Sequence, residues 1–168
     1  MSTVNQAYGS YSALTVTNLQ TLSSSATAIW QSDLIDIQTS TKALDYEVMV
    51  TLPVNNTAPG SDKAMYVFVV PFVTSDAGIT WLPGDIGTTT LPTGTQGTAT
   101  INSSSALKLL GILNYVTANQ TCRSQFNLSN AFGQSMPDGF SLLIENFSGA
   151  TLASACVVAI RAITQTIT

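Results

Sequence analysis

Hydrophobic and polar residues alternate along several short stretches of this chain. The clearest stretch is 44–54, LDYEVMVTLPV, where the apolar residues at positions 46, 48, 50 and 52 lie opposite Glu47, Met49 and Thr51. A period of two residues is that of a β-strand with one buried face. We therefore expect a strand over 44–54 whose even-numbered side chains enter a core.

Two further stretches are apolar on more than one face. The run 65–73, MYVFVVPFV, predicts a central strand except near Pro71, because proline has no amide hydrogen for the ladder. The run 107–116, LKLLGILNYV, also fits helical spacing, but Gly111 and the β-prone residues that follow it favour a strand.

The C-terminal region carries a strong strand signal. The runs 139–147 and 155–164 are rich in Phe, Ile and Val, and they flank the turn-like segment Ser148-Gly149-Ala150. In the second run, Arg161 shares a face with the apolar residues at 157, 159 and 163. Both runs are too short for comfortable helices, so we expect a pair of C-terminal strands that closes a β-domain.

Weaker patterns complete the chain. We expect a strand over 121–128 and short strands within 13–22, around 29–30 and within 79–82. Clusters of Gly, Pro, Ser, Thr and Asn predict loops at 55–63, at 130–136 and over 83–105, the last with a hairpin near 94–97.

Eight to ten short strands separated by turns predict an all-β fold. We expect an antiparallel β-sandwich, with a jelly roll as the favoured variant. Residues 1–12 have no period and are expected to form an extended, unpaired N-terminal arm, ahead of a single β-sandwich domain over 13–168.

Composition narrows the function. Charged residues make up 8% of the chain, compared with about 25% in an average soluble domain, and 24 threonines and 19 serines stand in their place. Such a surface suits dense packing against other protein. The net charge is −4 and the five basic residues are scattered, so we expect no binding to nucleic acid. We also expect no secretory signal, because the first residues, MSTVNQAYGS, contain neither a basic nor an apolar region. We expect no membrane span, because no apolar run approaches about 18 residues.

Candidate chemistry is sparse. The chain has no histidine, which excludes the usual catalytic triads and zinc sites. Cys122 and Cys156 would form a disulfide only on facing strands, and two buried thiols are the favoured interpretation.

Carboxylates offer one further type of site. Asp45 with Glu47, or Asp76 with Asp85, would resemble a glycosidase pair, but polar rim residues are the favoured interpretation. Asp62, Asp76 and Asp85 do not have the spacing of a calcium loop. We expect no catalytic residues, no cofactor and no metal.

Aromatic residues leave a binding alternative open. Trp30, Trp81, Tyr66 and Tyr115 could serve as sugar-stacking platforms in a lectin-like jelly roll, although such residues are more often core or interface anchors.

Most of the chain from residue 26 to residue 164 resembles a known family. The segments that carry the resemblance are TAIWQSDLIDIQTSTKALDYEVMVTL, MYVFVVPFV and FNLSNAFGQSMPDGFSLLIENFSGATLASACVVAIRAIT, with matches at Pro137, Phe140, Asn146, Ser148-Gly149 and Leu152. They resemble small β-sandwich virion proteins of tailed bacteriophages. The resemblance implies a capsid-decorating (cement) protein that clamps neighbouring major capsid subunits and has no catalytic residues.

The partners and location follow from this resemblance. We expect the major capsid protein as partner, a homo-oligomer (trimer or dimer), and a place on the capsid surface of the virion after synthesis in the host bacterial cytoplasm. The candidate contact residues are Tyr8, Tyr11, Trp81 and Leu91. The alternatives are a tail-fibre or lectin-like module that binds a receptor or glycan and, more remotely, a carboxylate-dependent glycan hydrolase.

Overall fold

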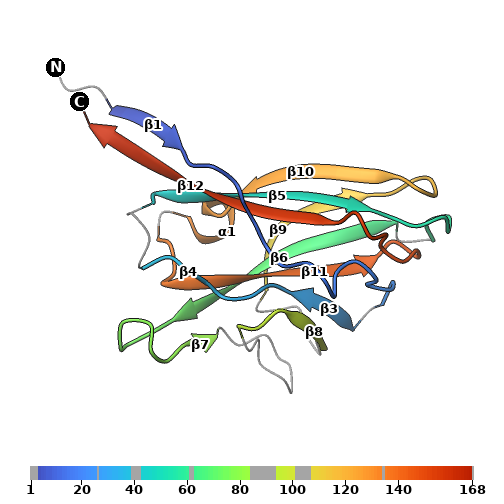
Figure 1. Ribbon diagram of the computed structural model, residues 1–168, viewed down its shortest axis with the longest axis horizontal. Helices are drawn as coiled ribbons and strands as arrows, with labels where there is room; N and C mark the ends of the chain where they lie inside the picture. The colour runs from blue at the N-terminus through green and yellow to red at the C-terminus, as the bar shows by residue number, and fades with distance from the viewer. Residues whose placement is uncertain are drawn as a thin grey trace.

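Two antiparallel sheets packed face to face form the body of the protein (Figure 1). The computed structural model describes residues 4–25, 27–38, 43–60, 63–83, 94–100, 107–133 and 135–167. Within these ranges the only helix is the single turn α1 (Ser129–Phe132). The expected all-β antiparallel sandwich is therefore confirmed.

The first sheet, sheet A, contains the two ends of the described chain. Its strands are, in spatial order, β1 (Val4–Tyr8), β12 (Val157–Ile167), β5 (Asp45–Pro53) and β10 (Thr121–Asn127), with β2 (Ser12–Ala13) also paired to β12.

The second sheet, sheet B, is built around two long central strands. Its strands are, in spatial order, β7 (Leu82–Pro83), β6 (Ala64–Val73), β11 (Gly139–Phe147), β3 (Ala28–Gln31) and β8 (Gly97–Thr100), with β9 (Lys108–Asn114) paired to β6 and β4 (Ile35–Asp36) paired to β11.

The eight principal strands are paired in a nested order. The first pairs with the last (β1 with β12), the second with the seventh (β3 with β11), the third with the sixth (β5 with β10) and the fourth with the fifth (β6 with β9). This nesting, with four of these strands in each sheet, is the arrangement of a jelly roll. The expected C-terminal pair, β11 and β12, is divided between the two sheets and does not form a hairpin.

The main core lies between the sheets and follows the predicted alternation. The even-numbered residues of β5 and β11 point into it, and Trp30 of β3 is fully buried beside them. Burial of such aliphatic and aromatic side chains contributes about 1.5–3 kcal/mol each.

A second apolar cluster covers the outer face of sheet B. Its buried members are Ile29, Phe68, Val70, Phe72, Leu107 and Leu143. Strand β6 thus buries residues on both faces, as its sequence predicts. The expected interruption near Pro71 is wrong, because the strand continues to Val73. Pro71 lies where the neighbour of β6 changes from β9 to β7, so the missing amide hydrogen falls at a gap in the pairing.

Three local expectations, at 13–22, 79–82 and 130–136, are corrected. Of the stretch 13–22 only Ala13 belongs to a strand, and the rest turns so that Leu19 and Leu22 enter the core. The hairpin expected near 94–97 stays a prediction, because β8 pairs with β3 and the residues that would form the other half of the hairpin lie outside the described ranges. Of the strand expected within 79–82, only Leu82 belongs to a strand. The loop expected over 130–136 overlaps the end of α1. In each corrected case tertiary contacts override weak local patterns.

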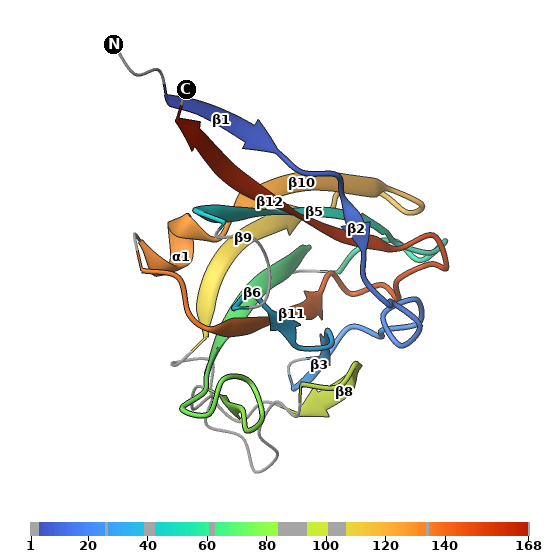
Figure 2. The same cartoon turned by 60° about the vertical axis from the view of Figure 1, so that its left-hand side comes forward.

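The N-terminal segment differs from the expected unpaired arm. Strand β1 pairs with the end of β12 in the register Val4↔Ile167 to Tyr8↔Ile163. Both views show this two-stranded ribbon projecting away from the body of the sandwich, with the two ends of the described chain, Val4 and Ile167, paired at its tip (Figures 1 and 2). The segment is extended, as expected, but it is held by the opposite end of the chain.

Candidate functional site

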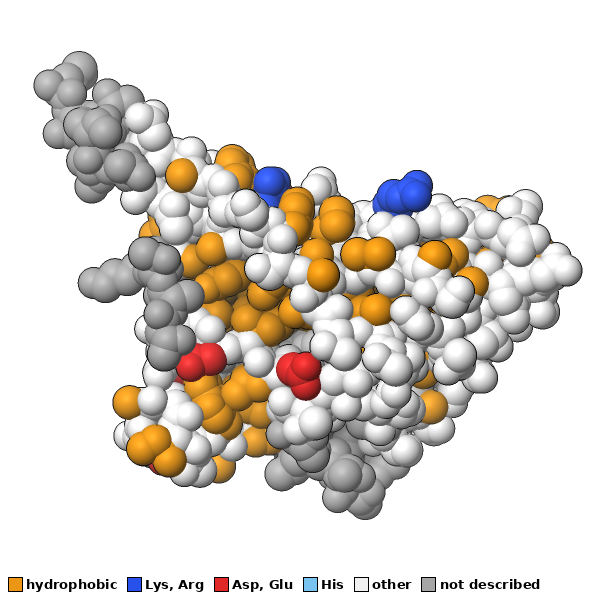
Figure 3. All heavy atoms as spheres, viewed as in Figure 1, with side chains coloured by type: hydrophobic (Ala, Val, Ile, Leu, Met, Phe, Trp, Pro, Cys, Tyr) orange, Lys and Arg blue, Asp and Glu red, His pale blue; other side chains and the backbone are white. Residues whose placement is uncertain are grey.

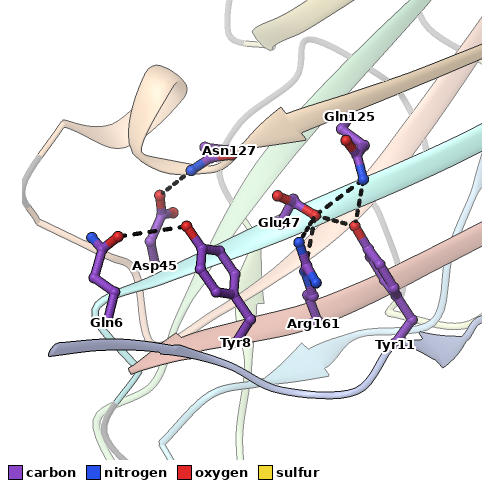
Figure 4. A network of polar contacts seen from close by, with 8 residues as sticks. All are labelled: Gln6, Tyr8, Tyr11, Asp45, Glu47, Gln125, Asn127 and Arg161. Carbon is purple, nitrogen blue, oxygen red and sulfur yellow. Dashed lines mark hydrogen bonds and ion pairs between the residues drawn. The ribbon is translucent and has the colours of Figure 1, made fainter. Parts of the chain in front are cut away.

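The most elaborate group of polar side chains lies on the outer face of sheet A, beneath the N-terminal segment (Figure 4). Odd-numbered residues of β5 and β12 point to this face, and the register places Arg161 opposite Glu47. The Arg161 Nη2 atom lies 2.8 Å from Glu47 Oε1, and its Nε atom donates to the same oxygen at 2.9 Å. The two side chains retain 24% and 12% of their accessible surface, so water screens this ion pair only in part.

Three further side chains, those of Tyr8, Tyr11 and Gln125, join Glu47 and Arg161 in what we call the Arg161 cluster. The Tyr11 hydroxyl donates to Glu47 Oε1, and the Gln125 amide donates to the Tyr11 hydroxyl at 2.9 Å. Burial, followed by the hydrogen bond to Glu47, raises the pKa of Tyr11 above its usual value. One carboxylate oxygen therefore gathers groups from the N-terminal segment, β10 and β12.

The rings of Tyr8 and Tyr11 lie over the Arg161 guanidinium, with each ring centroid 4.6 Å from the central carbon. Residues three apart in a regular strand face opposite sides. In an antiparallel ladder the numbers of two paired residues add up to a constant. This sum is 171 at Tyr8↔Ile163 but 172 at Ser12↔Ile160, so one extra residue is inserted between β1 and β2. This irregularity brings both rings to the same face.

Asp45 and Glu47, which the sequence offers as a carboxylate pair but favours as polar rim residues, have separate structural roles. Glu47 holds the Arg161 cluster, whereas Asp45 accepts hydrogen bonds from the backbone N–H and hydroxyl of Ser129 at 2.9 and 2.7 Å and from the Asn127 amide at 3.0 Å. Asp45 thereby fixes the first residue of α1 to β5. Each carboxylate is occupied by its own partners, so they do not face a common substrate position.

A shallow, open hollow lies beside the Arg161 cluster on the same face. Its volume is about 250 Å³, and it lies between β5 and β10 against Met49, Thr51, Arg123, Ser124 and Gln125. Arg123 gives the hollow a positive charge. A hollow of this kind suits a side chain of a protein partner better than an enclosed small molecule.

The ends of β6 and β7, together with the loop that connects them, form an exposed apolar tip, defined here by Val73, Ile79 and Leu82. Ile79 is 85% exposed and Leu82 is 58% exposed. The Asp76 carboxylate organises the loop by accepting from the Thr74 hydroxyl and from the backbone N–H groups of Ile79 and Thr80. Hydrogen bonds from the side chain and the backbone of Thr80, followed by the one from the Thr74 side chain, lower the pKa of Asp76 to about 2.

The predicted contact residue Trp81 lies at the base of this tip. Its indole is half-buried and packs on the start of β11, where a Cβ atom on Gly139 would lie 2.8 Å from the ring. Tyr8 and Tyr11 lie together in the Arg161 cluster, far along the chain from Trp81. Leu91, Asp62 and Asp85 lie outside the described residues.

The other aromatic candidates are mainly structural. Trp30 and Tyr115 are buried, and the Tyr115 hydroxyl donates to the Leu52 carbonyl at 2.7 Å. Tyr66 is half-buried and stacks on Phe68 with 6.1 Å between the centroids. Neither Trp30 nor Tyr115 can therefore present a face to a sugar.

Groups for metal or redox chemistry are not brought together in the part of the chain that the structure describes. No set of three or more potential metal ligands occurs among those residues. Cys122 and Cys156 are free thiols, but only Cys156 is buried as expected, and Cys122 is half-buried. Burial raises the pKa of Cys156 to about 11. None of the described helices is long and apolar enough to cross a membrane.

Sequence reasoning overlooked the role of Arg161, although it contained a signal. A single arginine on an otherwise apolar strand face requires a partner, because an unpaired buried charge is costly. The partner, Glu47, is 114 residues away in sequence, so only the register between β5 and β12 identifies it.

Comparison with known proteins leaves the function to be argued from the structure. No protein-family model matches the chain, and a search of curated proteins finds no relative.

Proposed function

We propose that this protein is a structural virion protein, a decoration (cement) protein that binds the outer surface of a tailed-phage head and stabilises contacts between major capsid subunits. The observation that carries the proposal is a jelly roll with a nearly uncharged surface and an exposed apolar tip. Jelly rolls recur in viral shells and in lectins, but fold analogy alone does not assign function.

The character of the surface supports a role in protein contacts. In the view of Figure 3, acidic and basic side chains are few and scattered, and most of the surface is uncharged. A protein with 8% charged residues gains little protection from self-association by charge repulsion. Such a surface is suited to being covered in an assembly, where many weak and symmetric contacts add together.

The apolar tip is the proposed point of contact with the capsid. Val73, Ile79 and Leu82 are each more than half exposed. Val73 and Leu82 are paired at the ends of β6 and β7, and Ile79 projects from the connecting loop that Asp76 holds in one conformation. A preorganised apolar projection loses little conformational entropy when it enters a pocket on a partner. The tip therefore meets the requirements of an anchor in a protein interface.

The first test is the copy number of this protein in purified particles, relative to the major shell protein. A cement role requires one copy per shell subunit or a simple fraction such as one third. A handful of copies per particle would instead assign the protein to a tail or fibre, and its absence from particles would overturn the proposal.

The tip can be tested on particles stripped of this protein. We expect the variant Ile79→Ser/Leu82→Ser to rebind at least tenfold more weakly, because two apolar anchors are lost. Val116→Ser is the matched control, since Val116 is 69% exposed but lies outside the tip. Equal loss in both variants, or no loss in either, would contradict the role of the tip.

A second candidate function rests on Trp81. Its half-buried indole at the base of an exposed loop could stack on a sugar in a receptor-binding module of a tail fibre. Glycan binding would then quench Trp81 fluorescence, whereas buried Trp30 would provide an unchanged background. The quenching should vanish in Trp81→Phe, and saturable quenching that persists in this variant would exclude the site.

A further inference from the structure

The outer edge of β1 is an unpaired strand edge at the side of sheet A. Strand β1 pairs with β12 on one side, and no described strand pairs with it on the other. The side chains of Asn5, Gln6, Ala7 and Tyr8 are all exposed. A two-stranded ribbon is only marginally stable in water, so further pairing would stabilise it.

One contact shows which backbone groups of β1 bond to β12 and which point toward the open edge. The Gly9 N–H donates to the Ala162 carbonyl at 2.9 Å, so Gly9 and Ala162 form a hydrogen-bonded pair. Such pairs alternate along an antiparallel ladder, which makes Ala7 and Asn5 the next residues bonded to β12. The backbone N–H and C=O groups of Val4, Gln6 and Tyr8 therefore point toward the open edge.

These outward groups are arranged symmetrically about Gln6. If a second β1 strand approaches antiparallel with Gln6 opposite its own copy, Val4 lies opposite Tyr8 of that copy. Every outward N–H then meets a C=O, which gives about six hydrogen bonds across a two-fold axis. Centring the axis on Val4 or Tyr8 instead would leave some outward groups without a partner within the described strand β1 of the copy.

The sequence of β1 also lacks the features that keep strand edges apart. Natural edges are protected by lysine, proline, bulges or inward-pointing charges. Strand β1, VNQAY, contains no charged residue and no proline. Strand β10, at the opposite edge of the sheet, carries Arg123, which self-pairing would bring toward its own copy.

From this geometry we infer that β1 is a homodimer interface, in which two copies of this chain join their A sheets edge to edge about a two-fold axis at Gln6. A second copy is the occupant, because the uncharged strand and its symmetric outward groups complement themselves. This interface forms with or without a capsid, so its failure is separable from failure of the decoration role.

The oligomeric state in solution tests the inference. We expect the parent protein to sediment as a dimer, and Gln6→Pro and Gln6→Lys to sediment as monomers. Proline removes an N–H that points away from β12, and lysine places two like charges at the axis. Unchanged melting and circular dichroism of Gln6→Lys would show that the fold survives. A monomeric parent, or a dimer that persists in both variants, would overturn the inference.

Disulfide trapping tests the register. Gln6→Cys places two Cα atoms about 5.5 Å apart at the axis, within reach of a disulfide. Asn5→Cys is the matched control, because its two copies would lie about 8 Å apart and beyond that reach. We expect oxidation to trap a covalent dimer at position 6 at least tenfold more efficiently than at position 5. Equal trapping, or none at position 6, would contradict the proposed pairing.

Discussion

Glu47 and Glu145 occupy comparable places in the two sheets but have opposite surroundings. Each lies on a strand with neighbours on both sides, β5 between β12 and β10 and β11 between β6 and β3, and each points away from the main core. Their exposed fractions are similar, at 9% and 7%. The Glu47 carboxylate is held by Arg161, Tyr11 and Gln125, whereas no hydrogen bond or ion pair joins the side chain of Glu145 to another described residue.

The consequence of this difference is visible in the pKa of Glu145. Its register neighbours are Tyr66 and Ile29, and Leu143 precedes it on the same face of β11. Burial among these apolar side chains raises the pKa of Glu145 to about 7. On the outer face of sheet A, the Glu47 carboxylate fastens the N-terminal segment. On the outer face of sheet B, the Glu145 carboxyl group is buried without a charged partner among the described residues.

The largest expected effect comes from Glu145→Gln. The folded-state pKa of Glu145 lies above the unfolded value of 4.5, so folding favours the protonated form. The parent protein therefore loses stability as pH rises from about 4.5 through about 7, by on the order of 3 kcal/mol. The variant should lack this loss and be more stable than the parent at alkaline pH. Urea unfolding across this range measures the difference, and parallel pH profiles would refute it.

A smaller effect of opposite sign is expected from Glu47→Gln. This change leaves Arg161 partly buried without its carboxylate, and it should destabilise the fold by about 2 kcal/mol at neutral pH. Thermal unfolding of the two glutamine variants side by side provides the measurement. Destabilisation by Glu145→Gln together with stabilisation by Glu47→Gln at neutral pH would contradict both expectations.

Removal of one hydroxyl tests the Arg161 cluster more finely. Tyr11→Phe keeps the ring over Arg161 but removes the hydrogen bond to Glu47, which should cost about 1 kcal/mol. Because the bond joins the N-terminal segment to sheet A, amide exchange of the segment should accelerate about fivefold while exchange of β5 stays unchanged. Equal acceleration in both elements would indicate a global effect.

The smallest effect is expected from Tyr8→Ala. Tyr8 is 55% exposed, so the loss of its contact with Arg161 should cost about 0.5 kcal/mol. This change is too small for thermal unfolding but should appear as faster exchange at Ala7 and Gly9. Unchanged exchange there would show that the backbone pairing with β12 alone orders β1.

Much of the fold could be predicted from local patterns. The alternation in β5 and the run of β6 that is apolar on both faces identify strands, because the residue types show which face of each strand is buried. Strand β1 could not be found in this way, because VNQAY has no apolar period. It becomes a strand because the end of β12 offers it a partner, which is a tertiary cause.

The site was less predictable than the fold. Alternation places Arg161 and Glu47 on outward faces, but their contact depends on a register between strands that are far apart in sequence. Tyr8 and Tyr11 were predicted as contact residues, yet their shared face depends on the extra residue between β1 and β2, which no sequence period reveals.

The nested pairing of the strands also determines when the molecule can be completed. Strand β12 lies between β1 and β5, so sheet A lacks a central member until the last part of the described chain has been synthesised. During translation, β1 is synthesised before the other described strands, and the longest stretch of chain separates it from its partner β12. Folding dominated by such distant pairings is slow, and an interrupted chain would expose the edges of β1 and β5 together.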